Sequence, residues 1–389
     1  MVVHLTTVDL SLALLLLPQL RAFKAAGYRV VGVSAAGPFV RQLEASGIEH
    51  VALRHSTRTM SLTEDLAAAW EFYRLCRRLR PDVVHTHNPK PGVYGRIAAR
   101  LAGVPVVVNT VHGLYAQPTD RMRRRLVVYT LERIAAAFSD AELLQNPEDL
   151  PVLRRLRVPN ERLHLLGNGI DLARFDPVAH RPSRQIVRSE LGIDPDEVVV
   201  GVVGRLVEEK GYLEVFEAAR MLRGDGVAVR FLVAGPHEPA KADAVSEAEI
   251  ERAQQEGVLF LGYRDDVERL YAAMDLYVLA SHREGFPRSA MEAAAMGLPA
   301  VVTDIRGCRQ VVEHGQTGFI VPVRDGAALA RAIADLVQQA EVRTTLGAAA
   351  QQKAAREFDD RRQSDITLAV YRTLLASAAR PRGVRCRRT

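Results

Sequence analysis

The sequence lacks most features that mark secreted, membrane-spanning or metal-binding proteins. Its 389 residues contain three cysteines, Cys76, Cys308 and Cys386, which lie far apart with neither disulfide nor zinc spacing. A reducing cytoplasm therefore fits best. The longest apolar run near the start, residues 12–20, is too short to span a bilayer and contains Pro18. No basic segment precedes this run, so we do not expect a signal peptide.

Two nucleotide-binding signatures are also missing. The chain has no G-x-G-x-x-G and no Walker loop, which removes the main support for a dinucleotide dehydrogenase or a P-loop NTPase. No D-x-D metal motif stands between an apolar strand and a turn. Asp265 and Asp266 instead open a helical pattern, so we expect them to cap a helix N-terminus.

Charge is distributed unevenly along the chain. The net charge is +6, with 47 arginines but only five lysines. Residues 1–170 carry 22 basic and 14 acidic groups (+8), and residues 171–389 carry 30 and 32 (−2). The basic first half suits an anionic membrane surface or a phosphate-bearing acceptor, and a solvated arginine-rich face remains open. Nucleic acid is disfavoured because no aromatic-interleaved basic motif appears.

Short β-branched runs alternate with helical patterns through both halves of the chain. In the first half the predicted strands are residues 2–6, 29–34, 50–54, 82–87, 105–111, 141–145 and 162–166. In the second half they are EVVVGVVG, VRFLVAG, VLFLGY, LYVLAS and PAVVTD. This βαβ alternation predicts α/β architecture with two doubly wound parallel sheets. Ligands of such sheets bind beyond the carboxyl ends of the strands.

Two strand ends in the second half carry charged motifs. GRLVEEKG follows the first of these strands, and Gly204, Arg205 and Lys210 could hold a diphosphate there. A solvated turn with a Glu-Lys pair is the alternative. HREGFPRSAME follows LYVLAS and contains Glu284 and Glu292.

The spacing of these two glutamates decides between two kinds of chemistry. Eight residues of continuous helix would cover about 12 Å, whereas glycosidase carboxylates need roughly 5–9.5 Å. A tight turn and a helix start also separate Glu284 from Glu292. The spacing therefore favours contacts to two ends of an elongated ligand, such as a nucleotide sugar, over an acid–base pair.

The motifs together resemble the retaining family 4 glycosyltransferases of the GT-B fold. The match consists of G-R-L-x-x-x-K-G, E-x7-E, GLPAVVTDIRG and TGFIVP in that order, and the resemblance covers essentially the whole chain. It implies two Rossmann-like domains facing a cleft. Residues 1–170 would form the acceptor-side domain and residues 171–360 the donor domain. Residues 361–378 would form a helix that crosses back to the first domain, with a basic tail at 379–389.

The resemblance also implies residue roles. Arg205 and Lys210, next to Gly204, would bind the donor diphosphate, and Glu284 would contact sugar hydroxyls. Glu292 would accept hydrogen bonds from the ribose. Three residues would hold sugar and phosphate through their backbone: Gly285, Phe286 and Pro287. NTVHGLY would place His112 at the reacting end of the sugar, and the catalytic set would be His112, Arg205, Lys210 and Glu284.

The acceptor side departs from the family pattern in one place. Where many members have a Gly-Gly loop after the first strand, this chain has TTVDLS, so glycine-loop contacts do not carry over. HTHNPKPG and LGNGID do fit the family. We assign the acceptor side to Thr7, Asp9, His87 and Asn88.

Relatives with these motifs build polysaccharide or lipid-linked oligosaccharide. We therefore expect a hexosyltransferase that uses a nucleotide-sugar donor, UDP linked to an N-acetylhexosamine or hexose, without metal or other cofactor. The acceptor would be a glycan or an undecaprenyl-diphosphate-linked saccharide. The enzyme would be cytoplasmic, with peripheral contact at the inner face of the membrane. RMRRR at 121–125 suits such contact, although a solvated helix face is the alternative. A UDP-sugar 2-epimerase and a non-catalytic nucleotide-sugar-binding protein remain open.

Overall fold

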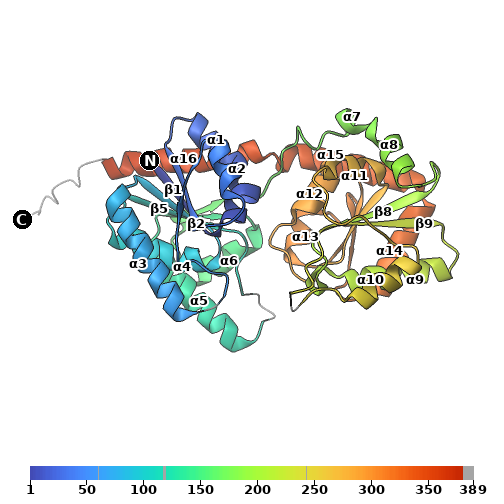
Figure 1. The fold of residues 1–389 in the computed structure, drawn as a ribbon, viewed down its shortest axis with the longest axis horizontal. Coiled ribbons are helices and arrows are strands. Elements are labelled where there is room, and N and C mark those ends of the chain that lie inside the picture. Colours follow the sequence, from blue (N-terminus) through green and yellow to red (C-terminus); the bar gives the residue numbers. More distant parts are fainter. Residues whose placement is uncertain (60, 117–119, 242, 380–389) are drawn as a thin grey trace, which may run out of the picture. The chain divides into compact units, whose positions relative to one another are not determined.

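The chain folds into two compact α/β units (Figure 1). A computed structural model describes residues 1–59, 61–116, 120–241 and 243–379. The first unit comprises Met1–Gly167 together with the residues from Asp360 onward, and the second comprises Asn168–Asp359. The boundary between the units follows Gly167, three residues before the predicted boundary after residue 170. The predicted basic tail, apart from its first residue, lies outside the described residues.

A seven-stranded parallel sheet forms the centre of the first unit, in the order β3-β2-β1-β4-β5-β6-β7. The strands are β1 (Val2–Val8), β2 (Val30–Ala35), β3 (Glu49–Ala52), β4 (Val83–Thr86), β5 (Val106–Val111), β6 (Ala141–Leu144) and β7 (Leu163–Leu165). All seven occupy the predicted places to within two residues. Their valine-rich runs are buried because helices cover both faces of the sheet.

Successive strand residues point to opposite helix layers. Val2 and Val83 pack with η1, α1 and α16 on one face, whereas Val3 and Val84 pack with α3 and α4 on the other. α4 also packs against α5. The helices of this unit are η1 (Ser11–Leu16), α1 (Leu17–Ala25), α2 (Val40–Ala45), α3 (Leu62–Leu79), α4 (Pro89–Leu101), α5 (Met122–Ala136), η2 (Pro147–Asp149), α6 (Leu150–Arg155), η3 (Asn160–Arg162) and α16 (Asp360–Ala379).

The second unit contains a six-stranded parallel sheet in the order β10-β9-β8-β11-β12-β13. Its strands are β8 (Val198–Val203), β9 (Val229–Ala234), β10 (Leu259–Phe260), β11 (Leu276–Leu279), β12 (Ala300–Thr303) and β13 (Gly318–Val321). Five were predicted. The sixth, β13, falls in TGFIVP and was not predicted, because a four-residue strand gives little periodicity. The α/β fold class with two Rossmann-like sheets is thus confirmed.

Helices again cover both faces of this second sheet. α9 and α14 pack on one face, and α8, α11, α12, α13 and α15 pack on the other. The helices are α7 (Pro177–His180), α8 (Ser183–Glu190), η4 (Glu208–Lys210), α9 (Tyr212–Gly224), α10 (Glu247–Gln255), α11 (Val267–Ala273), α12 (Arg288–Ala295), α13 (Arg306–Val311), α14 (Gly326–Gln338) and α15 (Ala340–Glu357). Among the helices described in both units, none is sufficiently long and apolar to cross a bilayer.

One sequence expectation in this unit holds for the position of a residue but not for its hydrogen bonds. Asp266 does stand at the N-cap of α11, but its side chain makes no capping hydrogen bond. The carboxylate instead forms ion pairs with Arg264 (2.7 Å) and Arg269 (3.3 Å). Two nearby guanidinium groups outcompete the backbone N–H groups, and the Arg264 hydrogen bond lowers the pKa of Asp266.

Candidate active site

The order of strands in the second sheet marks where a ligand site belongs. The chain runs outward from β8 to β10 on one side and from β11 to β13 on the other, so β8 and β11 are neighbours at a topological switch point. Ligands of open α/β sheets bind in the crevice at the carboxyl ends of such strands. The segments that follow β8 and β11 are GRLVEEKG and HREGFP, the two charged motifs singled out from the sequence.

An ion pair joins these two segments. Lys210 Nζ lies 2.5 Å from Glu284 Oε1, although the two residues are 74 positions apart. Ser281 Oγ donates a second hydrogen bond to the same oxygen (2.9 Å). Both charged side chains are largely but not completely buried. Because an ammonium group has three N–H donors, the pair orients Lys210 while leaving it able to bind phosphate oxygens.

A left-handed glycine brings Lys210 to this position. Gly211 has φ of 73° between η4 and α9, and a Cβ atom there would lie 2.0 Å from the carbonyl oxygen of Ala280. Any other residue would push the segment away from the end of β11. The Tyr212 hydroxyl then donates to the Gly204 carbonyl (2.7 Å), which closes the loop. Arg205 lies exposed within this loop.

Three distant segments support the loop that carries Glu284. Thr303, at the end of β12, donates from its hydroxyl to the Ser281 carbonyl (2.5 Å). A Cβ at Gly307 would lie 2.7 Å from the carbonyl oxygen of Glu284, so α13 can approach only with glycine there. The Asn168 amide donates to the Phe286 carbonyl (3.1 Å). The motifs TDIRG and LGNGID therefore help to fix the conformation of the loop that carries Glu284.

Glu292 is held by different groups. It lies in α12, which begins directly after Pro287, and Tyr271 Oη lies 3.0 Å from its Oε2. The pKa of Glu292 is raised chiefly by burial, while Arg288 and the Tyr271 hydroxyl act in the opposite direction. Glu284 contacts Lys210 and Ser281, whereas Glu292 contacts Tyr271. Their separate surroundings fit two binding contacts better than one shared proton-transfer step.

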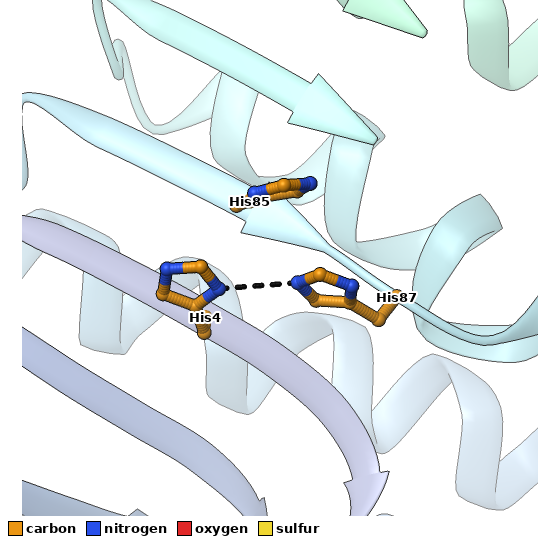
Figure 2. A group of neighbouring side chains, drawn as sticks. All are labelled: His4, His85 and His87. Carbon is orange, nitrogen blue, oxygen red and sulfur yellow. Dashed lines mark hydrogen bonds between the residues drawn. The ribbon is translucent and has the colours of Figure 1, made fainter. Parts of the chain in front are cut away.

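Buried histidines form a network at the corresponding switch point of the first sheet (Figure 2). His4 Nδ1 lies 3.1 Å from His87 Nε2, and His87 Nδ1 lies 3.1 Å from His112 Nε2. His85 contacts Tyr371 Oη (2.5 Å) and Thr110 Oγ1 (2.7 Å). His112, predicted at the reacting end of the sugar, is therefore oriented by His87. The network also includes His4 and His85, which the sequence reasoning did not select.

Burial keeps these imidazoles neutral. Desolvation lowers the pKa of His4 to about 3 and that of His112 to about 4, and in His112 it outweighs a hydrogen bond with Gln145 that raises the pKa. Desolvation, reinforced by the neighbouring imidazoles, holds the pKa values of His85 and His87 well below their usual range. A charged imidazole would lack solvent and face like charges here.

The same histidines are the group best placed to hold a metal within the described residues. The ligand atoms of His4, His85 and His87 lie within 4.8 Å of one another. Both ring nitrogens of His85 and of His87 already face hydrogen-bond partners, however. Among the described residues, His4 Nε2 is the one buried ring nitrogen of these three histidines that has no hydrogen-bond partner. The geometry therefore fits a hydrogen-bonded network better than a chelate.

The residues assigned to the acceptor side lie around the ends of β1 and β4. Asn88 Oδ1 accepts a hydrogen bond from the Thr7 backbone N–H (3.2 Å), so HTHNPKPG and TTVDLS meet. Asn88 has φ of 69°. The buried Asp9 carboxylate accepts the backbone N–H groups of Leu10 (2.9 Å) and Phe39 (2.8 Å). Through these two hydrogen bonds Asp9 stabilises the loop that follows β1.

Two protein families match the chain, one for each unit. The family described as Glycosyl transferases group 1 matches residues 183–353, and the family described as Glycosyltransferase Family 4 matches residues 17–174. The match to residues 183–353 contains the four motifs on which the resemblance rests, and the match to residues 17–174 contains HTHNPKPG, NTVHGLY and LGNGID.

Named relatives extend this similarity over the chain. The UDP-Gal:alpha-D-GlcNAc-diphosphoundecaprenol alpha-1,3-galactosyltransferase of Escherichia coli is 33% identical over 271 residues, 69% of each protein. The capsular polysaccharide biosynthesis glycosyltransferase CapM of Staphylococcus aureus is 27% identical over 96% of this chain and 97% of its own. Anabaena Alr3699/HepE, solved in complex with UDP, has a TM-score of 0.79 and 22% identity, covering 96% of this chain and 99% of that one. That structural likeness supports the fold.

The neutral histidine network predicts acid sensitivity of the first unit. A histidine whose folded pKa lies below its unfolded value of about 6.5 gains a proton only on unfolding. The free energy of unfolding should therefore fall as the pH drops from about 6.5 towards 4, by roughly 1.4 kcal/mol per pH unit for each such histidine. Urea unfolding followed by Trp70 emission measures this, because the chain's single tryptophan lies in α3 of this unit.

One substitution sharpens that measurement. His4→Gln should reduce the pH slope, because it removes one of the imidazoles that burial holds neutral. A free energy of unfolding that stays constant between pH 7 and pH 5 would show that the imidazoles are not held neutral.

Proposed function

Because this chain belongs to the family 4 glycosyltransferases, which have the GT-B fold, we propose that it transfers a sugar from a UDP-linked donor to a lipid-linked saccharide. We further propose that the anomeric configuration is retained and that no metal is needed. The observation that carries the proposal is the Lys210–Glu284 pair at the switch point, with Glu292 held separately in the helix that follows. Such an arrangement suits an elongated ligand with phosphates between a sugar and a ribose.

The second unit would bind the donor. Lys210 and Arg205 supply positive charge for the diphosphate, and the Gly204 turn lets backbone approach it. The Glu284 carboxylate accepts hydrogen bonds from sugar hydroxyls, and the backbone of Gly285–Pro287 lies at the start of α12, where helix N–H groups favour anions. The Glu292 carboxylate would accept hydrogen bonds from the ribose hydroxyls.

The acceptor proposal comes from the named relatives. The Escherichia coli relative acts on a GlcNAc-diphosphoundecaprenol, and the Staphylococcus aureus relative belongs to capsular polysaccharide biosynthesis. An acceptor with an undecaprenyl diphosphate and a short saccharide combines a carbohydrate hydroxyl with an anionic lipid anchor. The first unit, with its basic balance and its histidine network, would bind that acceptor. Such an acceptor also places the reaction at the inner face of the membrane.

In the proposed reaction the bond between the anomeric carbon and the phosphate oxygen of the donor breaks. The acceptor hydroxyl oxygen forms its bond to the anomeric carbon on the same face, and its proton passes to the departing diphosphate. Negative charge grows on the terminal phosphate, so Lys210 and Arg205 stabilise the transition state more than the bound donor. Neutral His112 would position the sugar without transferring a proton.

A product assay tests the function as a whole. UDP release and glycolipid formation are measured with a panel of UDP- and GDP-sugars, with and without undecaprenyl-diphosphate-linked GlcNAc, in buffer containing EDTA. We expect UDP release that requires the acceptor and survives EDTA. Acceptor-independent conversion of the donor sugar would indicate a 2-epimerase. UDP binding without any turnover would indicate a binding protein, and activity rescued only by Mn²⁺ would contradict metal independence.

Lys210→Ala should lower kcat by at least about tenfold at saturating donor, because a charge-assisted hydrogen bond contributes roughly 1.5–3 kcal/mol. Lys241→Ala is the matched control, since Lys241 pairs with Glu238 on the surface of the same unit. Steady-state kinetics with the acceptor held constant give both values. An unchanged kcat for Lys210→Ala would rule out its role at the leaving phosphate.

Glu292→Ala should weaken donor binding more than it slows the chemical step, because the proposed ribose contact is the same in the bound donor and the transition state. Calorimetric titration with UDP and a KM-against-kcat comparison measure the two effects. The reverse pattern, a large loss of kcat with unchanged affinity for UDP, would support an acid–base role for the glutamate pair.

A further inference from the structure

Three histidines of the first unit form a continuous hydrogen-bonded chain, the histidine chain. His4 lies in β1, His87 directly after β4, and His112 directly after β5. His4 Nδ1 lies 3.1 Å from His87 Nε2, which Figure 2 shows, and His87 Nδ1 lies 3.1 Å from His112 Nε2. His4 and His87 are buried, whereas His112 is only partly buried. The chain therefore leads from the interior of the sheet to a side chain that a ligand can reach.

His85 packs against this chain without being a member of it. Its ring stacks on that of His87, with 4.2 Å between the ring centres. Its Nδ1 faces Tyr371 Oη (2.5 Å) and its Nε2 faces Thr110 Oγ1 (2.7 Å). Because both ring nitrogens face these two partners, His85 does not set the proton positions on the other three rings.

The two bonds of the histidine chain are coupled to each other. A neutral imidazole carries one N–H donor and one acceptor nitrogen, and burial keeps the rings of His4, His87 and His112 neutral. The position of the proton on one ring therefore fixes its position on the next. Only two arrangements satisfy both bonds: all three rings carry the proton on Nδ1, or all three carry it on Nε2.

The buried end of the chain decides between these arrangements. Among the described residues, His4 Nε2 has no hydrogen-bond partner, and the His4 ring stacks on Phe23 of α1 with 5.4 Å between the ring centres. A proton on Nε2 would be a buried N–H group without an acceptor. Such donors are rarer in proteins than buried acceptors without a donor. The proton therefore belongs on Nδ1 of His4, from which it is donated to His87.

The arrangement at His4 determines what His112 offers at the other end. His112 Nε2 faces His87, so Nδ1 is the nitrogen that remains for other partners. When all three rings are protonated on Nδ1, this nitrogen is a donor. Gln145, which hydrogen-bonds with His112, can accept from it through its carboxamide oxygen, and a ligand hydroxyl oxygen can do the same.

We propose that the histidine chain runs in one direction, from His4 through His87, and holds His112 as an Nδ1–H donor towards a ligand oxygen. His4 and His87 are then positioning residues that act through His112, because each fixes the tautomer of the next ring. A donor fixed before the ligand arrives needs no rearrangement when the ligand binds. The identity of the ligand oxygen, a hydroxyl of the donor sugar, rests on the proposed function.

Nuclear magnetic resonance of the free protein tests the direction without substrate. The full chain is labelled with ¹⁵N-histidine, and the ¹⁵N shifts at pH 7.5 distinguish a protonated from an unprotonated ring nitrogen. His112→Gln, His87→Gln and His4→Gln assign the signals by their loss. We expect His4, His87 and His112 each to be neutral and protonated on Nδ1.

Two matched substitutions at the buried end test whether His4 sets the direction. The side-chain amide of His4→Asn can still donate to His87, so His112 should stay protonated on Nδ1. The carboxylate of His4→Asp can only accept, so His87 and His112 should both become protonated on Nε2. If His4→Asp does not fold, the native protein and His4→Asn still decide the matter.

Two further variants serve as controls. His164→Asp places a carboxylate at another strand histidine of the same unit, in β7, and should leave the His112 signals unchanged. Tyr371→Phe removes the partner of His85 Nδ1 and should shift the His85 signals without altering the tautomer of His112. Circular dichroism verifies that each variant is folded.

Kinetics connect the tautomer to the reaction. His4→Asp should lower kcat/KM for the UDP-sugar donor about fivefold, the size of one neutral hydrogen bond, and His4→Asn should restore most of that loss. The affinity for UDP, measured by calorimetric titration, should stay unchanged in both variants, because UDP lacks the sugar that His112 would contact. A purely structural role of His4 would lower thermal stability without this difference between the two variants.

Three results would overturn the proposal: His112 protonated on Nε2 in the native protein, a doubly protonated His112 at pH 7.5, and the same His112 tautomer in His4→Asn and His4→Asp. If the predicted tautomers are found while the product assay shows no transfer, the directed chain stands and the proposed function fails. If transfer occurs while His112 is protonated on Nε2, the function stands and the directed chain fails.

Discussion

The arrangement of the donor site depends on one ion pair between two strand-end loops. Lys210 and Glu284 meet at 2.5 Å because β8 and β11 are neighbours and because Gly211 allows its segment to approach Ala280 closely. Without that approach the ammonium group would sit in solvent and the carboxylate would lack a cation. Glu292 stays outside this pair and lies against Tyr271. Lys210 and Glu292 are thus separated in space, as an elongated ligand with different chemical groups along its length requires.

The two units use the same topology for different chemistry. At the switch point of the second sheet, charged side chains are partly exposed and can bind an anion. At the switch point of the first sheet, His4, His85 and His87 are buried and His112 is partly buried. Desolvation keeps these four imidazoles neutral, so they are held by hydrogen bonds but carry no charge.

The sequence predicted the fold because the fold rests on local patterns, and the same kind of pattern singled out the candidate site residues. Valine-rich strands and the E-x7-E spacing are visible in short windows, whereas the four-residue strand β13 is not. His4 and His85 were missed, although VVHLT and DVVHTH place a histidine after the same Val-Val pair and the two align across β1 and β4. The exposed face of α5 could not be predicted, because an apolar helical pattern looks the same whether tertiary packing buries it or leaves it open.

The most direct test of the central claim is a crystal structure of the protein with UDP bound. We predict the ribose hydroxyls within hydrogen-bond distance of Glu292 and the terminal phosphate within that distance of Lys210, with Glu284 on the side of the phosphate where the sugar would be. A nucleotide bound away from the ends of β8 and β11 would contradict this account. So would a complex in which Glu284 and Glu292 converge on the same ligand atom.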